Sequence, residues 1–347
     1  MGHNSNNKKN LSKDSTEVLA NENGENMMMA MIKDEKLSEI FYIMKALAIF
    51  TVICAHCNLE NANYISGVYK NIGTIGVGVF LFISGFYLKM DADFFKYRNK
   101  FFTTLKPWAI ASSIIWLEVS IRKGDISFLS WMFHLIGNGS IFYFFVVYFI
   151  IWAIAIIVIN KIKLNCTIAF VVSFILNIVA NIMENSSISF FPTPLLNPFV
   201  FLSYFMLGCL FGRNKDKFLL YSNSPLCLLG GGALLVLFLP GFSTYYWNGI
   251  IEILIECSII MFLPCIASML LKYKKYIIPV GKDTLFIYIW HLIPMTLVNY
   301  VGNKYLIMQN CFILWPFVVL LTMACVGNIF RNINICKLNS LLGVNSK

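Results

Sequence analysis

The chain has 347 residues, of which 58% are hydrophobic and only 13% are charged. Soluble domains are about half apolar and about a quarter charged, so this composition excludes a soluble fold and indicates a polytopic membrane protein. The formal net charge is +10, but the basic residues are spread over short loops between apolar segments, which argues against a nucleic-acid-binding protein.

Three parts of the chain differ in composition. Residues 1–38 are polar, rich in Asn and mixed in charge, which predicts a disordered tail. Residues 39–332 are dominated by apolar segments and form the expected transmembrane domain. Residues 333–347 are expected to be a short tail at the C-terminus.

The apolar segments predict an all-α fold with about ten transmembrane helices, because a spanning helix needs about 20 apolar residues. They lie near 40–58, 72–88, 101–121, 141–160, 165–183, 198–212, 219–239, 248–271, 283–301 and 310–331. With this count, sixteen Lys and Arg residues fall in loops on the side of the N-terminus and four on the opposite side. The positive-inside rule then places both termini in the cytoplasm. The protein is expected to lie in the cytoplasmic (inner) membrane.

The first apolar segment contains the run "KALAIFTVICAHC", Lys45 to Cys57, with an ionisable residue near each end. Lys45 and His56 differ by about 20° around a helix and lie about 16 Å apart along it. Both therefore line one face, Lys45 near the cytoplasmic end and His56 near the outer end. The alternative is a lysine that reaches the interface and a hydrogen-bonded core histidine.

The same run holds Cys54 and Cys57, spaced as in redox and zinc sites. No second Cys/His pair occurs at ligand spacing, so small apolar packing is the favoured interpretation and no metal is predicted.

Four further ionisable residues fall inside apolar segments, where charges are costly and mark function or pairing. They are Glu118, Glu252, Glu256 and His291. A cytoplasmic basic cluster, which includes Arg98, Lys100 and Lys106, follows the second segment. Such a cluster suits a phosphate-bearing ligand or anionic membrane lipid, and both remain open.

Four stretches resemble motifs of one known family. "KALAIFTVICAH" (45–56) and "GTIGVGVFLFISGFYL" (73–88) are similar to the helix-one and helix-two signatures of the acyltransferase-3 family of membrane acyltransferases. "KYRNKFFTTLKPW" (96–108) resembles its basic segment, and "DTLFIYIWHLIP" (283–294) resembles its late tyrosine-and-histidine helix. The expected helix count agrees with the resemblance.

The resemblance implies transfer of an acyl group, often acetyl, from cytoplasmic acyl-CoA to a hydroxyl of a cell-envelope glycan or lipid-linked saccharide. It implies that His56 is the general base. Glu118, Glu252 and Glu256 are candidates for the group that orients it, and the alternative is that they pair with Lys123, Arg122 or backbone groups. The residues expected to bind acyl-CoA are Lys45, Arg98, Lys100 and Lys106. Three further candidate site residues are Ser84, Tyr288 and His291.

Two positions depart from the family pattern. Lys45 stands in place of the signature arginine, and Thr103 stands where a second basic residue is expected three positions after Lys100. Lysine keeps the charge but lacks the planar fork of arginine. These departures favour, as an alternative, a binding or sensor protein on the same scaffold. A transporter or flippase is a further alternative, because a Lys/His-lined path also suits transport.

Overall fold

The structure is a computed structural model that describes residues 7–57, 64–88, 94–124, 126–136, 143–185, 191, 194–229, 232, 249–333, 339 and 341–344. Within these residues the regular structure is helical throughout, with no strand. The elements are α1 (Asn7–His56), α2 (Tyr64–Phe86), α3 (Phe94–Lys123), α4 (Phe128–Leu135), α5 (Tyr143–Ala155), η1 (Ile156–Lys161), α6 (Cys166–Asn185), η2 (Pro194–Leu196), α7 (Phe199–Gly212), α8 (Lys215–Ser222), α10 (Gly249–Met269), η3 (Leu270–Tyr273), α11 (Lys274–Lys282), α12 (Thr284–Trp290), α13 (Leu292–Lys304), α14 (Leu306–Asn310), η4 (Phe312–Leu314) and α15 (Trp315–Ile333).

Five helical stretches in the described part are long and apolar enough to cross a membrane: Met31–His56, Tyr143–Lys161, Cys166–Glu184, Glu256–Lys282 and Phe312–Ile333. The count rises to six if α12 and α13, bent by 49°, form one span. The prediction of an all-helical, multi-pass membrane protein is therefore confirmed. By length and composition the described residues give five or six spans where the sequence predicted ten.

The difference in count has physical causes. The apolar parts of two expected spans, Ile75–Phe86 and Phe199–Gly212, are shorter than the roughly 20 residues of a typical span. A third, α3, carries basic residues near both ends. The expected span at 219–239 lies largely outside the described residues.

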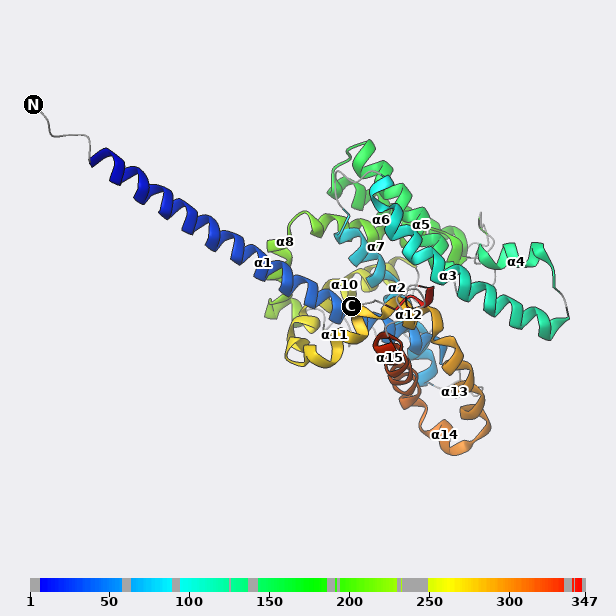
Figure 1. Cartoon of the computed structure of the whole chain (residues 1–347). Coiled ribbons are helices and arrows are strands. Elements are labelled where there is room, and N and C mark those ends of the chain that lie inside the picture. The colour runs from blue at the N-terminus through cyan, green and yellow to red at the C-terminus, as the bar shows by residue number, and fades with distance from the viewer. Residues whose placement is uncertain are drawn as a thin grey trace, which may run out of the picture.

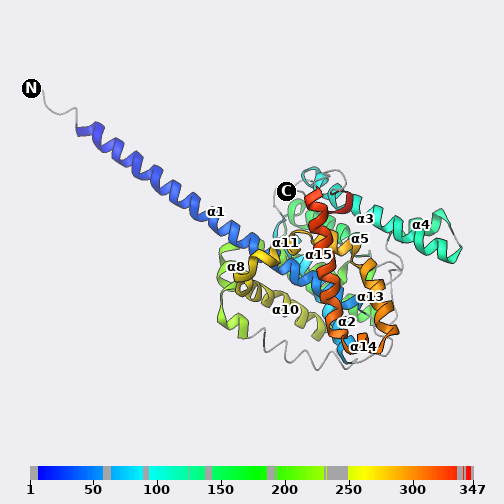
Figure 2. The same cartoon turned by 60° about the horizontal axis from the view of Figure 1, so that its bottom comes forward.

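Helix α1 is continuous from Asn7 and projects from the helical body (Figures 1 and 2). The boundary that composition places at residue 38 thus falls inside this helix. Where α1 reaches the body, exposed ion pairs join it to α8 and to the start of α11. The pairs are Lys33–Asp216 at 3.0 Å, Lys215–Asp34 at 3.2 Å and Lys274–Glu39 at 2.6 Å.

The centre of the body is built on α1, α2 and α7, which pack in that order. At the contact between α2 and α7, the backbones approach so closely that a Cβ atom on Gly85 would overlap the carbonyl oxygen of Phe205. A Cβ atom on Gly208 would likewise overlap the carbonyl oxygen of Phe82. We call this contact the glycine seam. Small residues are what allow such close helix packing in a membrane.

The junction of α11 and α12 is fixed by a buried ion pair between Asp283 and Arg331 of α15. Helix α12 ends at Trp290, and the chain bends before α13 begins at Leu292. Pro294 explains the bend, because proline lacks a backbone N–H and its ring clashes with the carbonyl four residues earlier. This break leaves His291 between two helices.

Candidate functional site

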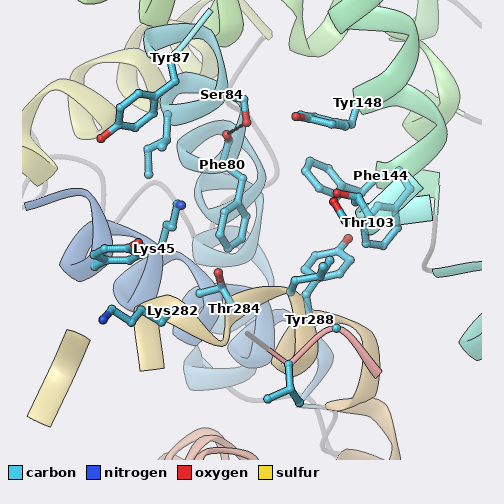
Figure 3. Close-up of a pocket in the computed structure, with 17 residues that line it drawn as sticks. Lys45, Phe80, Ser84, Tyr87, Thr103, Phe144, Tyr148, Lys282, Thr284 and Tyr288 are labelled. Atoms are coloured by element: carbon cyan, nitrogen blue, oxygen red, sulfur yellow. Dashed lines mark hydrogen bonds between the residues drawn. The ribbon is translucent and has the colours of Figure 1, made fainter. Parts of the chain in front are cut away.

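A cavity of about 550 Å³ lies among α1, α2, α3, α5, the α11–α12 junction and the last described residues of the chain (Figure 3). Three residues predicted for the site line it: Lys45, Ser84 and Tyr288. They come from three helices that are distant in sequence. The fold therefore brings together side chains that the sequence could only name separately.

One side of the cavity is cationic. Lys45 and Lys282 both line it, and both ammonium groups lie over the ring of Tyr42, at 5.4 Å and 5.7 Å from its centroid. Lys45 is half-buried and Lys282 is exposed. Two ammonium groups on one side of a cavity are an arrangement that suits an anionic ligand group such as a phosphate.

The deeper wall is aromatic. The ring of Tyr288 lies 5.3 Å from Phe144, 5.4 Å from Phe145 and 6.3 Å from Phe80, measured between centroids. Phe80 comes from α2, Phe144 and Phe145 from α5, and Tyr288 from α12. A wall of this kind suits an extended, uncharged chain.

Hydroxyl groups line the cavity between these two regions. The hydroxyl of Ser84 donates to the carbonyl of Phe80 at 2.8 Å. The side chain of Tyr148, on α5, points toward Ser84 (Figure 3). Thr284 donates to the carbonyl of Gly281 at 3.2 Å. Thr103, which occupies the position of a basic residue in the family pattern, also lines the cavity.

Two histidines lie side by side. The ring centroids of His56, at the end of α1, and His291 are 5.2 Å apart. The carbonyl of His56 accepts a hydrogen bond from the Asn299 side chain of α13 at 3.0 Å, which ties the end of α1 to the helix after the bend. Each histidine was predicted as a site residue, but their pairing was not.

The surroundings of His291 fix its tautomer. Its Nδ1 lies 2.8 Å from the carbonyl oxygen of Tyr288 and 3.2 Å from that of Ile287. Because carbonyl oxygens only accept, Nδ1 carries the proton, and Nε2 of the neutral ring carries a lone pair. Nε2 is buried and has no hydrogen-bond partner within the described structure.

Tyr288 connects the cavity to the histidine pair. Its side chain lines the cavity, and its ring centroid lies 6.1 Å from that of His291. The cationic side, the aromatic wall and the two imidazoles thus follow one another through the protein. Lys45 and His56 belong to the same helix, α1, at two ends of this series.

The predicted carboxylates lie in different surroundings. Glu256 is buried and accepts a hydrogen bond from the hydroxyl of Tyr204, between α10 and α7. Glu118 is exposed on α3. The side chain of Glu252 lies outside the described residues, so its expected role as a partner of His56 stays a prediction.

The basic cluster is likewise only partly described. Lys106 is exposed on α3 and does not belong to the described lining of the cavity. The side chains of Arg98 and Lys100 lie outside the described residues. Sequence reasoning missed Lys282 as a cation of the cavity, although its place directly before "DTLFIYIWH" was an available signal.

The two cysteines of the C-x-x-C pattern are buried and free. The Sγ of Cys57 lies 3.8 Å from the Sδ of Met295. Among the described residues, no group of three His, Cys, Asp or Glu side chains has the arrangement of a metal site.

Comparison with known proteins gives one informative match. No curated protein and no solved structure matches the chain. The family model described as "Acyltransferase domain" (Acyl_transf_3) matches residues 41–330, which is more than half of the chain and contains Lys45, His56, Lys282 and His291. The resemblance predicted from the sequence is thereby confirmed, and the chain belongs to the acyltransferase-3 family of membrane acyltransferases.

Proposed function

We propose that the protein transfers an acyl group, most simply acetyl, from cytoplasmic acyl-CoA to a hydroxyl of an extracytoplasmic or lipid-linked envelope glycan. The observation that carries the proposal is the continuity of the site. A cavity with two lysines on one side leads along an aromatic wall to Tyr288, and Tyr288 adjoins the pair of His56 and His291.

The cavity fits the chemistry of the donor. CoA carries phosphates at one end, which suit Lys45 and Lys282, and its pantetheine arm is a long flexible chain, which suits the aromatic wall. Lys282 provides a second cation in a cavity where Thr103 replaces an expected basic residue. Lys282, on α11, thus supplies the positive charge that is absent at Thr103.

The imidazoles fit the chemistry of the transfer. His56 takes the proton from the acceptor hydroxyl, because imidazole exchanges protons near neutral pH. The acceptor oxygen forms a bond to the thioester carbonyl carbon, the C–S bond breaks, and the proton held by His56 passes to the CoA thiolate. His291, with its Nδ1 proton held by backbone carbonyls, keeps a buried Nε2 lone pair beside the ring of His56.

This proposal requires donor and acceptor to approach from opposite sides of the membrane. We therefore retain the ten-span topology with both termini in the cytoplasm of the inner membrane. Lys45 and Lys282 then face the cytoplasmic donor, and His56 lies toward the outer acceptor.

Reporter fusions test the topology. Fusions placed after Lys217 and after Lys282 should both report a cytoplasmic location, because loop charges follow the positive-inside rule. The measurement is the activity of a reporter that works on only one side of the membrane, with a fusion after Lys123 as the control expected outside. An external signal after Lys217 or Lys282 contradicts the topology.

Substitution of the lysines tests the donor site. Lys45→Ala should weaken acyl-CoA binding by about 10- to 100-fold, because a hydrogen bond to a charged group contributes about 1.5–3 kcal/mol. Lys282→Ala should have a smaller effect, because Lys282 is exposed and water screens its charge. Lys45→Arg should retain affinity, and Thr103→Arg should increase it. Calorimetry on purified protein measures each value.

Lys106→Ala is the matched control, because it removes an exposed lysine outside the cavity. Its affinity for acyl-CoA should remain close to that of the wild type. Equal affinities in Lys45→Ala and the wild type would reduce Lys45 to a lysine that only reaches the membrane interface.

The whole function is tested with labelled acetyl-CoA and cell-envelope fractions. Label should pass to the fraction in the presence of the purified wild-type protein and be released by mild base, as expected for an ester. Binding of acyl-CoA without any transfer to envelope material would instead favour the binding or sensor alternative.

A further inference from the structure

The end of the chain folds back against the cavity. Asn339 and residues 341–344, here called the C-terminal strap, belong to the segment that the sequence predicts to be a short cytoplasmic tail. Gly343 and Val344 line the cavity, and Val344 is only 4% exposed. In Figure 2 the red segment lies at the edge of the helical body, beside α3 and α15. The strap is therefore one wall of the candidate donor site.

Apolar packing and hydrogen bonds hold the strap in place: Val344 is part of the hydrophobic core, and Leu342 packs against that core. The indole N–H of Trp290 donates to the carbonyl of Leu342 at 3.0 Å, and the N–H of Val344 donates to the carbonyl of Asn339 at 2.9 Å. Gly343 adopts a φ of +82°, a left-handed conformation that glycine takes without strain. A segment this short opens at lower free energy than the long helices around it.

Asn339 gives independent support for a strap that opens. Its side chain is 1% exposed, and both its amide nitrogen and its amide oxygen are buried without a hydrogen-bond partner in the described structure. Such groups lose their bonds to water and gain nothing in return, so burial here opposes the closed position.

We propose that the C-terminal strap is a movable wall of the donor site, which closes over bound acyl-CoA and opens to release CoA. The inference rests on the proposed function, because it takes acyl-CoA to be the occupant of the cavity. The strap is well placed for this role. A Cβ atom on Gly343 would lie 3.3 Å from Leu285 and 3.4 Å from Pro107, so the strap bridges α12 and α3 beside Lys282 and Thr284.

Two changes to the strap test the proposal. A chain that stops before Asn339 and the Gly343→Ala variant should each bind acyl-CoA about tenfold more weakly, and each should release CoA faster. The KM for the acceptor should not change. Alanine disfavours the left-handed conformation and also crowds Leu285 and Pro107, so it opposes closure without deleting the segment.

Gly124→Ala is the matched control. Gly124 is also left-handed, with a φ of +69°, but a Cβ atom there would have no neighbour within 4 Å. The control therefore carries the same backbone penalty far from the cavity, and its acyl-CoA affinity should equal that of the wild type.

A second measurement does not depend on activity. Carboxypeptidase digestion of the purified wild-type protein, followed by intact mass spectrometry, should slow at Val344 and slow further when CoA is added. Gly343→Ala should be digested faster. Unchanged acyl-CoA affinity in both strap variants, or digestion through Val344 that CoA does not slow, overturns the strap proposal alone. A wild-type protein that binds no acyl-CoA overturns the proposed function together with it.

Discussion

His56→Gln should lower the rate of acyl transfer by about 10²–10⁴-fold, the usual contribution of a general base. Glutamine keeps a hydrogen-bonding group of similar reach but cannot take a proton at neutral pH. His56 lies beside His291 at the far end of the series that starts at Lys45, so acyl-CoA binding should stay close to that of the wild type. Initial rates with labelled acetyl-CoA and calorimetry on the same preparation separate the two effects.

The neighbouring cysteines supply the controls. Cys54→Ser and Cys57→Ser change buried positions within two residues of His56, and both variants should retain activity if these residues only pack. A His56→Gln variant that works at nearly the wild-type rate shows that the base is another group. If both cysteine variants are inactive and metal copurifies with the wild type, a metal site must replace the assignment of His56 as base.

Arg331→Met should destabilise the protein by about 3–5 kcal/mol, because it leaves the carboxylate of Asp283 buried without its cation. The side chains of Asp283 and Arg331 are 3% and 16% exposed, and Asp283 Oδ1 already lacks a hydrogen-bond partner in the described structure. The double variant Asp283→Asn with Arg331→Met should be more stable than Arg331→Met alone, because it removes the isolated charge. The unfolding midpoint of each variant in detergent measures these stabilities.

This ion pair also affects the cavity. Asp283 stands between Lys282 and Thr284, which both line it, so Arg331→Met should also weaken acyl-CoA binding. Lys274→Met is the control, because it breaks an exposed pair with Glu39 that water screens, and its unfolding midpoint should change little. If Arg331→Met and Lys274→Met unfold at the same midpoint, the buried pair does not hold α12 to α15.

The sequence predicted those parts of the site that depend on one helix at a time. Apolar runs and helical periodicity suffice to identify the helices and to place Lys45 and His56 on one face. Motif resemblance then adds Ser84, Tyr288 and His291, and the cavity does contain Lys45, Ser84 and Tyr288.

Contacts between helices were beyond such reasoning. Lys282, the last residue of α11, lines the cavity from the junction with α12, which the Asp283–Arg331 pair holds to α15. Glu256 lies against Tyr204 because α10 packs near α7, which no local pattern of either helix reveals. The histidine pair needs the bend before α13, although Pro294 was a visible cause. The C-terminal strap was missed because its composition is that of a tail.

The glycine seam has a consequence for motion. Each of its glycines lies against a carbonyl oxygen of the opposite helix, so α2 and α7 cannot slide past each other by a fraction of a turn without atomic overlap. Transporters that work by alternating access rock one bundle of helices against another, and here the two central helices would have to move as a single rigid block. Phe80 and Ser84 belong to that block, so we expect their side of the cavity to move together with α7. We therefore expect any widening of the cavity to come from the helices and chain segments that face α2 across it.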